Sequence, residues 1–195
     1  MITMQQSKFN AVRIDVEQGS QAWLDLRKKH VCASDASMIM GLSPWRTREE
    51  LLEEKKGLRK PQEINFAMQR GMLLEPEARK LAEDLLDTLF LPGVYVSEEY
   101  PFMLASYDGI SIDEKIILEI KCPGKKAHSD AKKGEIPAYY KPQLQHQMAV
   151  CGLDRVHYFS FDGSSGIILV QERDEKFIQK MIEMEEEFYN EMINA

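Results

Sequence analysis

Apolar positions recur along the chain with two different spacings, which divide it into helical and extended segments. A three- to four-residue spacing is typical of helices and covers six segments: 20–29, 35–40, 47–57, 63–89, 137–150 and 174–192. Short alternating or continuous apolar runs predict six strands: 94–100, 102–107, 108–112, 115–121, 155–161 and 166–173. This order of helices and strands predicts an α/β or α+β fold with a mixed central sheet flanked by helices.

Polar residues mark where these helices begin. Residues suited to cap a helix N-terminus stand before four of the helical segments: Ser20, Ser34, Thr47 and Asp174. Thr47 is followed three residues later by Glu50, which predicts a capping box. Pro76 interrupts the long pattern over 63–89 and predicts a new helical segment with Glu75 at its start.

A hairpin is predicted where two apolar runs, 104–112 and 115–121, flank a charged turn. Side chains alternate along a strand, so Glu119 and Lys121 share one face and Leu118 and Ile120 the other. The turn brings Asp108 back beside Glu119. Two carboxylates and one ammonium group then meet on an otherwise apolar strand pair.

The simplest interpretation of these three charges is a solvated ion pair at a sheet edge, without a catalytic role. The apolar run around Glu119 instead favours a central, buried strand, where charge is costly unless it is paired or holds a metal. Carboxylates are the hard oxygen ligands that Mg²⁺ prefers. A nearby lysine positions water or offsets negative charge during phosphodiester hydrolysis. We therefore expect a Mg²⁺ site formed by Asp108 and Glu119, with Lys121 beside it.

Composition limits the remaining choices. With 195 residues, 44% hydrophobic and 29% charged, the chain predicts one soluble domain spanning 1–195. It has no apolar run of membrane-spanning length and no secretory signal, so we expect a cytoplasmic protein without a membrane partner. Three widely spaced cysteines and four histidines lack metal-ligand spacing, which argues against zinc and disulfides. The net charge of −7 argues against a nucleic-acid coat but permits an enzyme with a confined basic channel.

An ordered set of motifs resembles one family. Asp108 followed by Glu119-x-Lys121 resembles the pattern of the PD-(D/E)XK nuclease superfamily. The fuller set, from about 19 to 192, is similar to the phage lambda exonuclease and YqaJ-type viral recombinase family. It comprises Gly19, Trp23, Arg27, Ala33, Ser34, Asp35, Gly41, Glu75, Asp108, Gly109, residues 118–123, Gln143, Gln145 and residues 172–176.

The resemblance implies a restriction-endonuclease-like core and a 5′→3′ exodeoxyribonuclease acting on double-stranded DNA ends. It implies Mg²⁺ as cofactor, as two ions for which Mn²⁺ can substitute. It also implies a ring-shaped homotrimer, a phage single-strand annealing protein as partner, and a phage or prophage gene expressed in the cytoplasm of a bacterial host. Two alternatives stay open: an endonuclease or structure-specific nuclease of the same superfamily, and a non-catalytic DNA-end-binding recombination scaffold.

The resemblance also assigns roles around the metal. Asp108 and Glu119 are metal ligands, the Ile120 carbonyl is a further ligand, and Lys121 assists the attacking water. Glu75 approaches the metals from a helix. Gln143 and Gln145 are two residues apart and cannot share a helix face, and we expect Gln145 to point inward as a catalytic residue.

A second set of residues is expected to bind DNA. The simplest interpretation of Arg27 and Ser34 is a solvated arginine and a helix cap; the functional one is a 5′-phosphate pocket. The family resemblance implies that Ser106 and Gln145 complete this pocket. Arg46 is expected near the downstream duplex. Met68 is either an apolar wedge that parts base pairs or part of the core. The lysines within 125–133 are expected in a solvated loop, unless that loop faces the channel.

Overall fold

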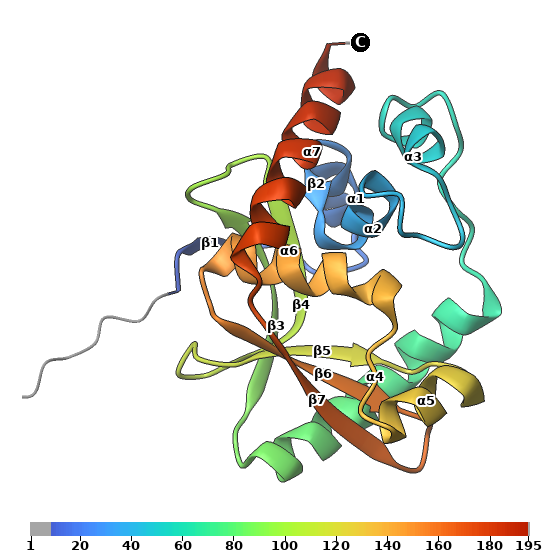
Figure 1. Ribbon diagram of the computed structural model, residues 1–195, viewed down its shortest axis with the longest axis vertical. Coiled ribbons are helices and arrows are strands. Elements are labelled where there is room, and N and C mark those ends of the chain that lie inside the picture. Colours follow the sequence, from blue (N-terminus) through green and yellow to red (C-terminus); the bar gives the residue numbers. More distant parts are fainter. Residues whose placement is uncertain (1–8, 195) are drawn as a thin grey trace, which may run out of the picture.

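A seven-stranded mixed sheet organises the protein, for which a computed structural model describes residues 9–194 (Figure 1). Its strands are β1 (Ala11–Ile14), β2 (Val31–Cys32), β3 (Phe90–Ser97), β4 (Met103–Ser111), β5 (Ile117–Lys121), β6 (Arg155–Phe161) and β7 (Gly166–Glu172). The spatial order is β1-β3-β4-β5-β6-β7, with β2 also pairing with β4. The β5–β6 and β2–β4 pairs are parallel and the others antiparallel, which confirms the predicted mixed sheet.

Helices cover both faces of this sheet. They are α1 (Gln21–Lys28), α2 (Ala36–Ile39), α3 (Arg48–Lys55), α4 (Phe66–Leu86), α5 (Lys125–Lys132), α6 (Lys141–Cys151) and α7 (Glu175–Ile193), with 3₁₀ turns η1 (Ala33–Asp35) and η2 (Ala138–Tyr140). On one face α4 packs through Ala78 and Ala82 against Leu118 of β5. On the other face α6, itself covered by α7, packs through Leu144 and Met148 against Ile117. The sheet is therefore the middle of three layers.

Most of the predicted helix caps are confirmed. Ser20 and Asp174 accept hydrogen bonds from the third helical amide of α1 and α7, and Thr47 forms the predicted capping box with Glu50. The prediction that Ser34 caps a helix is wrong, because Ser34 lies inside the turn η1, where the Asp35 carboxylate binds the Cys32 amide.

Helix α4 runs through Pro76 without a break over 21 residues, so the predicted new segment does not form. Proline removes the hydrogen bond to the carbonyl four residues earlier, that of Met72. Met72 is 62% exposed, so water can satisfy that carbonyl instead.

The two strands predicted over 102–107 and 108–112 form one continuous strand, β4, with a β-bulge. Tyr107 pairs with Gly93 and Ile110 with Leu91, so Asp108 and Gly109 oppose a single residue of β3. A Cβ at position 109 would lie 2.7 Å from the Phe90 Cβ, which explains the glycine. The bulge shifts the alternation of β4, because Tyr107 and Ile110 both enter the core beneath α6.

Three elements were not predicted: the short strands β1 and β2, and the helix α5, whose lysines were expected in a loop. The buried side chain of His128 anchors α5 to the sheet, since its Nδ1 lies 2.9 Å from the Ser160 hydroxyl. No helix within residues 9–194 combines the length and the apolar character needed to cross a membrane.

Candidate active site

Asp108 and Glu119 meet at the place where β4 and β5 separate. The last ladder pairs are Ile110 with Ile117 and Gly109 with Leu118. Beyond them, Asp108 Oδ2 takes the place of a backbone acceptor and binds the Ile120 amide at 2.7 Å. The Lys121 ammonium lies 2.5 Å from Glu119 Oε1. The predicted grouping of two carboxylates and one lysine is therefore present.

Glu119 is almost fully buried, at 2% exposure, and its carboxylate is held by one ion pair and two hydrogen bonds. Besides Lys121, two amides from α6 donate to it: Gln143 Nε2 to Oε1 at 2.6 Å and Gln147 Nε2 to Oε2 at 2.5 Å. The two glutamines stand four residues apart, so they share one face of α6. Gln147 was missed by the sequence analysis, although its spacing from Gln143 was the available signal.

Gln145 points away from this group, so the prediction that it faces the carboxylates is wrong. Its Nε2 donates to the Glu172 carbonyl at 2.8 Å, and its Oε1 accepts from the Asp174 amide at 2.9 Å. The buried side chain thus joins the end of β7 to the start of α7. Because Gln143 faces Glu119, helix geometry directs Gln145 to another side.

Burial and like charge control protonation at the site. Burial raises the pKa of Asp108 well above its usual range, and the negative charge of Glu119 raises it further. Burial disfavours the charged form of Lys121 and so lowers its pKa. The negative charges of Glu119 and Asp108 outweigh this effect, and the lysine pKa is raised. Lys121 Nζ also lies 5.1 Å above the ring centre of Tyr140. Two acids, the buried Glu119 and the partly buried Asp108, therefore share one cation, and added positive charge would favour the ionised form of Asp108.

Glu75 reaches the edge of the site through an arginine that was not predicted. Arg79, one turn further along α4, forms an ion pair with Glu75 and donates from Nε to the Asp108 carbonyl at 2.8 Å. Met68 lies seven residues before Glu75 and shares its helix face. Its side chain is 43% exposed, so the alternative that Met68 is core is wrong.

Arg27, Ser34 and Ser106 form a second group, connected through Trp23. Arg27 Nη2 donates to the Ser34 hydroxyl at 3.0 Å, and the guanidinium lies 4.7 Å from the Trp23 ring centre. The indole Nε1 donates to the Ser106 hydroxyl at 2.9 Å. Ser106 precedes Asp108 by two residues on β4, so this group adjoins the carboxylates. Gln145, expected here as well, is absent from it.

Comparison with known proteins identifies the family. Residues 22–154 match the family model of the YqaJ-like viral recombinase domain. The chain belongs to the YqaJ-like viral recombinase family. It is 32% identical over 183 residues to uncharacterized protein YqaJ of Bacillus subtilis, in an alignment that covers 91% of this chain and 57% of that protein. Protein D345L of African swine fever virus is 27% identical and is covered over 46% of its length, so the chain spans about half the length of these curated relatives.

Solved structures agree with this placement. The alkaline exonuclease LHK-Exo from Laribacter hongkongensis superposes with a TM-score of 0.77 at 28% identity, over 90% of this chain and 93% of that one. A phage-related exonuclease from Haemophilus somnus shares the fold with a TM-score of 0.59 at 18% identity, over 85% and 95% of the two chains. The resemblance inferred from the motifs and the fold class are both confirmed.

Behind Arg27, this YqaJ-like domain contains a buried ion pair. Lys55 Nζ lies 2.6 Å from Asp35 Oδ2 and donates to the backbone carbonyls of Arg27 and His30 at 2.7 and 2.9 Å. Burial raises the pKa of Asp35, but the charges of Lys55 and Arg27 overcome this and lower it below its usual value. The pair fixes the backbone from which the Arg27 side chain extends.

Arg46 is held by α3 rather than presented to solvent. Its Nη2 lies 2.8 Å from Glu54 Oε2 and donates to the Glu50 carbonyl at 3.2 Å, and its side chain is only 14% exposed. This geometry gives no support to the expected contact with duplex DNA, which would require the guanidinium to leave Glu54.

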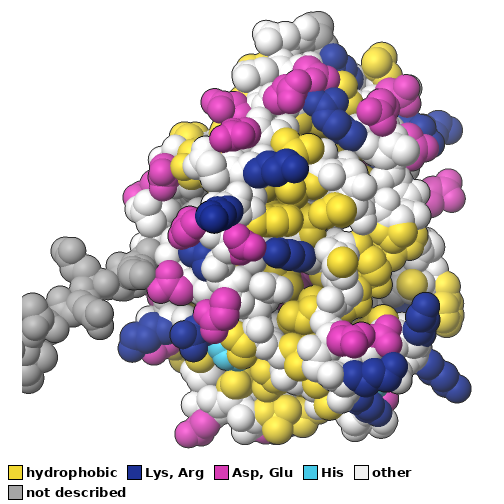
Figure 2. Space-filling model, viewed as in Figure 1, with side chains coloured by type: hydrophobic (Ala, Val, Ile, Leu, Met, Phe, Trp, Pro, Cys, Tyr) yellow, Lys and Arg dark blue, Asp and Glu magenta, His cyan; other side chains and the backbone are white. Residues whose placement is uncertain are grey.

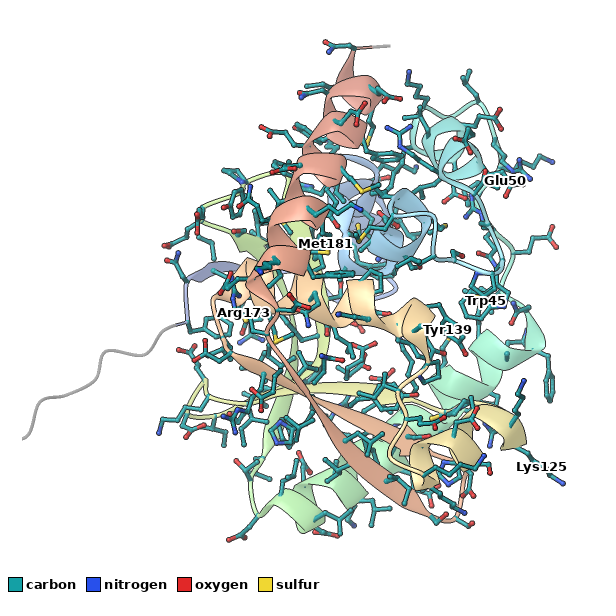
Figure 3. All side chains as sticks on the ribbon, in the orientation of Figure 1. Trp45, Glu50, Lys125, Tyr139, Arg173 and Met181 are labelled. Carbon is teal, nitrogen blue, oxygen red and sulfur yellow. The ribbon has the colours of Figure 1, made fainter. Side chains whose placement is uncertain are left out.

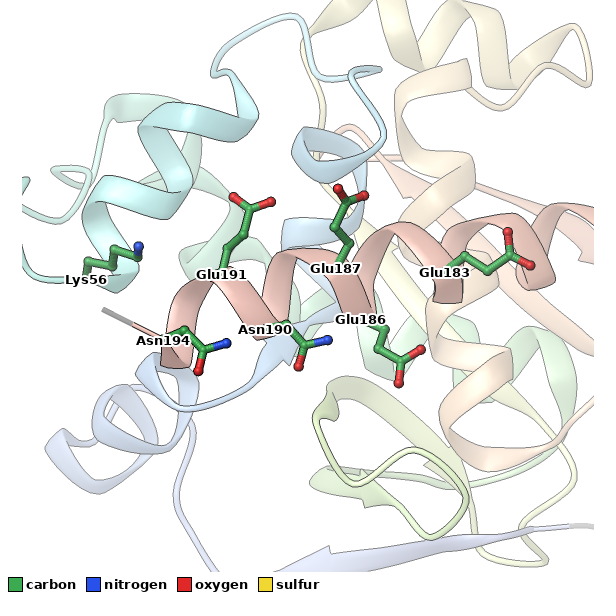
Figure 4. A pocket seen from close by; sticks show the side chains of 7 residues that line it. All are labelled: Lys56, Glu183, Glu186, Glu187, Asn190, Glu191 and Asn194. Carbon is green, nitrogen blue, oxygen red and sulfur yellow. The ribbon is translucent and has the colours of Figure 1, made fainter.

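An acidic groove lies at the far end of α7, away from the predicted site residues. It has a volume of about 660 Å³ (Figure 4). Its lining consists of Lys56, Glu183, Glu186, Glu187, Asn190, Glu191 and Asn194. Four carboxylates repel phosphate, so this groove does not suit nucleic acid.

The oxygen donors at β4 and β5 suit a hard divalent cation. No group of three or more His, Cys, Asp and Glu side chains within residues 9–194 is arranged to hold a metal. Asp108 and the buried Glu119 nevertheless form an acidic pair whose charge is only partly offset by Lys121. The Ile120 amide points to β4, and its carbonyl points to the same side of the strand. These two carboxylates and one carbonyl fit Mg²⁺, and Glu75 becomes available if Arg79 releases it.

Proposed function

We propose that this protein is a Mg²⁺-dependent 5′→3′ exodeoxyribonuclease that digests double-stranded DNA from its ends and leaves 3′ single strands for annealing. One observation carries the proposal: the acidic pair of Asp108 and the buried Glu119, with Lys121 in contact, adjoins the Arg27 group through Ser106. Family membership and similarity to an alkaline exonuclease support it.

Each residue of the acidic centre has a distinct part in this proposal. Asp108, Glu119 and the Ile120 carbonyl would hold Mg²⁺, which when bound supplies Lewis-acid stabilisation and a more acidic water. Gln143 and Gln147 hold Glu119 in one orientation. Lys121 orients the attacking water and offsets the negative charge that develops on the phosphate.

The Arg27 group accounts for the direction of digestion. A guanidinium offers a fork of donors to phosphate, and the Ser34 and Ser106 hydroxyls add two more. Trp23 holds Arg27 from one side by its ring and Ser106 from the other by its indole N–H. A 5′-phosphate bound there would place the strand end beside the Asp108 site and retain it between successive cuts.

Digestion of matched DNA ends tests the proposal. With Mg²⁺, the protein should release nucleotides from a linear duplex and faster from 5′-phosphorylated than from 5′-hydroxyl ends, and chelation should stop it. Arg27→Ala should remove the preference for phosphate. Lys28→Ala should keep it, because Lys28 is exposed and pairs only with Asp25 among the described residues.

Three outcomes would contradict this function. Cutting of closed-circular duplex would indicate an endonuclease or structure-specific nuclease, and binding of ends without release would indicate a scaffold. Equal rates on the two kinds of end would remove the 5′-phosphate role. The assembly is part of the proposal as well: we expect a homotrimeric ring that hands its single strand to a phage annealing protein, and a light-scattering mass tests the trimer.

A further inference from the structure

A row of aromatic rings runs from the surface to Lys121. Trp45 packs edge to face on Tyr139, with ring centres 4.7 Å apart, and Tyr139 packs on Tyr140 at 4.5 Å. Tyr140 carries the Lys121 ammonium over its ring at 5.1 Å. Trp45 comes from the loop between α2 and α3, whereas both tyrosines come from η2 before α6, and Figure 3 shows Trp45 and Tyr139 facing each other.

Trp45 is unusually open for the largest side chain. It is 64% exposed, although it makes a T-shaped ring contact with Tyr139. Most of the indole surface therefore remains open to a ligand. A hollow of about 460 Å³ lies beside it, lined in part by Met40, Pro44 and Met184. Figure 2 shows hydrophobic side chains gathering across this side of the molecule. Exposed apolar surface of this kind marks a binding site.

We propose that Trp45, supported by Tyr139, is a stacking platform for unpaired bases of the DNA strand at the cutting site. The proposal rests on the nuclease function proposed above. Every base has a flat face, so stacking on an aromatic ring is independent of sequence, as digestion of arbitrary DNA requires. A second copy of the chain could also cover an exposed tryptophan. Continuity of the row with Lys121, the residue beside Glu119, favours DNA.

The length of the row limits which base is bound. Its three contacts are each close to 5 Å, so the indole lies within about 15 Å of the lysine, or roughly four nucleotide spacings of 3.4 Å. We therefore expect the stacked base within about four nucleotides of the bond that is cut.

Binding to 5′-phosphorylated DNA ends in the presence of chelator tests this without cleavage. Trp45→Ala should weaken binding by about 5- to 150-fold, and Trp45→Phe should restore most of the affinity because a ring remains. Val170→Ala is the matched control, an exposed apolar residue on β7 that should change nothing. In Mg²⁺, Trp45→Ala should raise KM with little change in kcat.

An abasic scan separates stacking from a general loss of binding. Removing one base near the cut should weaken the wild type, and the same removal should have no further effect on Trp45→Ala. Independent, additive losses would overturn the proposal. So would unchanged DNA affinity in Trp45→Ala together with a reduced mass by light scattering, which would assign Trp45 to an interface between copies. If the wild type releases no nucleotides at all, the nuclease function itself fails, which is a separate result.

Discussion

Replacing Lys121 by methionine separates two roles of its positive charge: stabilising the fold through Glu119 and stabilising the transition state of cleavage. The substitution keeps the length and apolar stem of the side chain and removes the ammonium, which lies 2.5 Å from Glu119 Oε1. Glu119 retains its two amide donors, Gln143 and Gln147, so we expect the fold to persist. Lys115→Met is the matched control on the same hairpin, since Lys115 is 75% exposed and pairs with Asp113.

The expected losses differ for stability and for chemistry. Breaking a buried ion pair costs about 3–5 kcal/mol; here we expect ~2–3 kcal/mol, because Lys121 is 23% exposed and two hydrogen bonds to Glu119 remain. Removing one group that stabilises charge in a transition state lowers kcat by about 10²- to 10³-fold. DNA binding should be nearly unchanged.

The gain in thermal stability on Mg²⁺ binding is the most direct test of this role of Lys121. In the wild type the Lys121 ammonium lies against the Glu119 carboxylate that would hold a metal, so the two cations would compete for it. Lys121→Met should therefore gain more thermal stability from Mg²⁺ than the wild type gains, up to about 2.7 kcal/mol at a hundredfold excess over Kd. Thermal unfolding with and without Mg²⁺, together with single-turnover cleavage, tests both effects. Cleavage within tenfold of the wild type, or a smaller gain from Mg²⁺, would refute the reasoning.

Three further predictions concern the surroundings of this centre. Gln143→Ala should lower kcat, whereas Gln145→Ala should reduce stability and leave Mg²⁺ affinity unchanged, as titration calorimetry can show. Because the pKa of Asp108 is raised, the folded metal-free protein holds a proton that the unfolded chain has lost, so its stability should fall as pH rises above the usual aspartate range. Mg²⁺ binding should release that proton, so Mg²⁺ affinity should increase with pH, and calorimetry in two buffers measures the proton release. Lys55→Met leaves the buried Asp35 with only the more distant Arg27 guanidinium, 3.9 Å away, as a cationic partner. It should cost about 3–5 kcal/mol in urea unfolding, and a loss below 1 kcal/mol would contradict the buried pair.

The hairpin could be predicted from sequence because its signals are local. Alternation within 115–121 assigns the faces of β5, and a short charged turn sets which residues of β4 lie opposite. The bulge at Asp108 and Gly109 could not be predicted, because it depends on pairing with β3, a partner at a distance in sequence that the hairpin pattern does not contain. The bulge is nevertheless what lets Asp108 leave the ladder and bind the Ile120 amide.

The orientation of α6 shows a second limit. The sequence established that Gln143 and Gln145 could not share a face, but the choice between them depends on how the helix is rotated against the sheet. That rotation is set by tertiary contacts such as the hydrogen bond from the Tyr107 hydroxyl to the Gln147 carbonyl. Helix α6 is also buried along nearly its whole length, so no polar stripe reveals its inner face.

Charge clusters in a sequence overstate the charge available to DNA. Arg46, Arg48 and Lys55 belong to basic clusters along the chain, yet each pairs with a carboxylate of the same molecule: Glu54, Glu191 and Asp35. These cations stabilise the junctions of α3 and contribute little net field. The basic surface required by the proposed function must therefore come from elsewhere. We propose that α5 contributes to it through Lys125 and Lys126, which are exposed on a helix whose buried His128 bonds to β6, the strand beside β5. The folding of 125–132 as a helix, which the sequence did not reveal, places that charge on an element fixed next to the strand that carries Glu119 and Lys121.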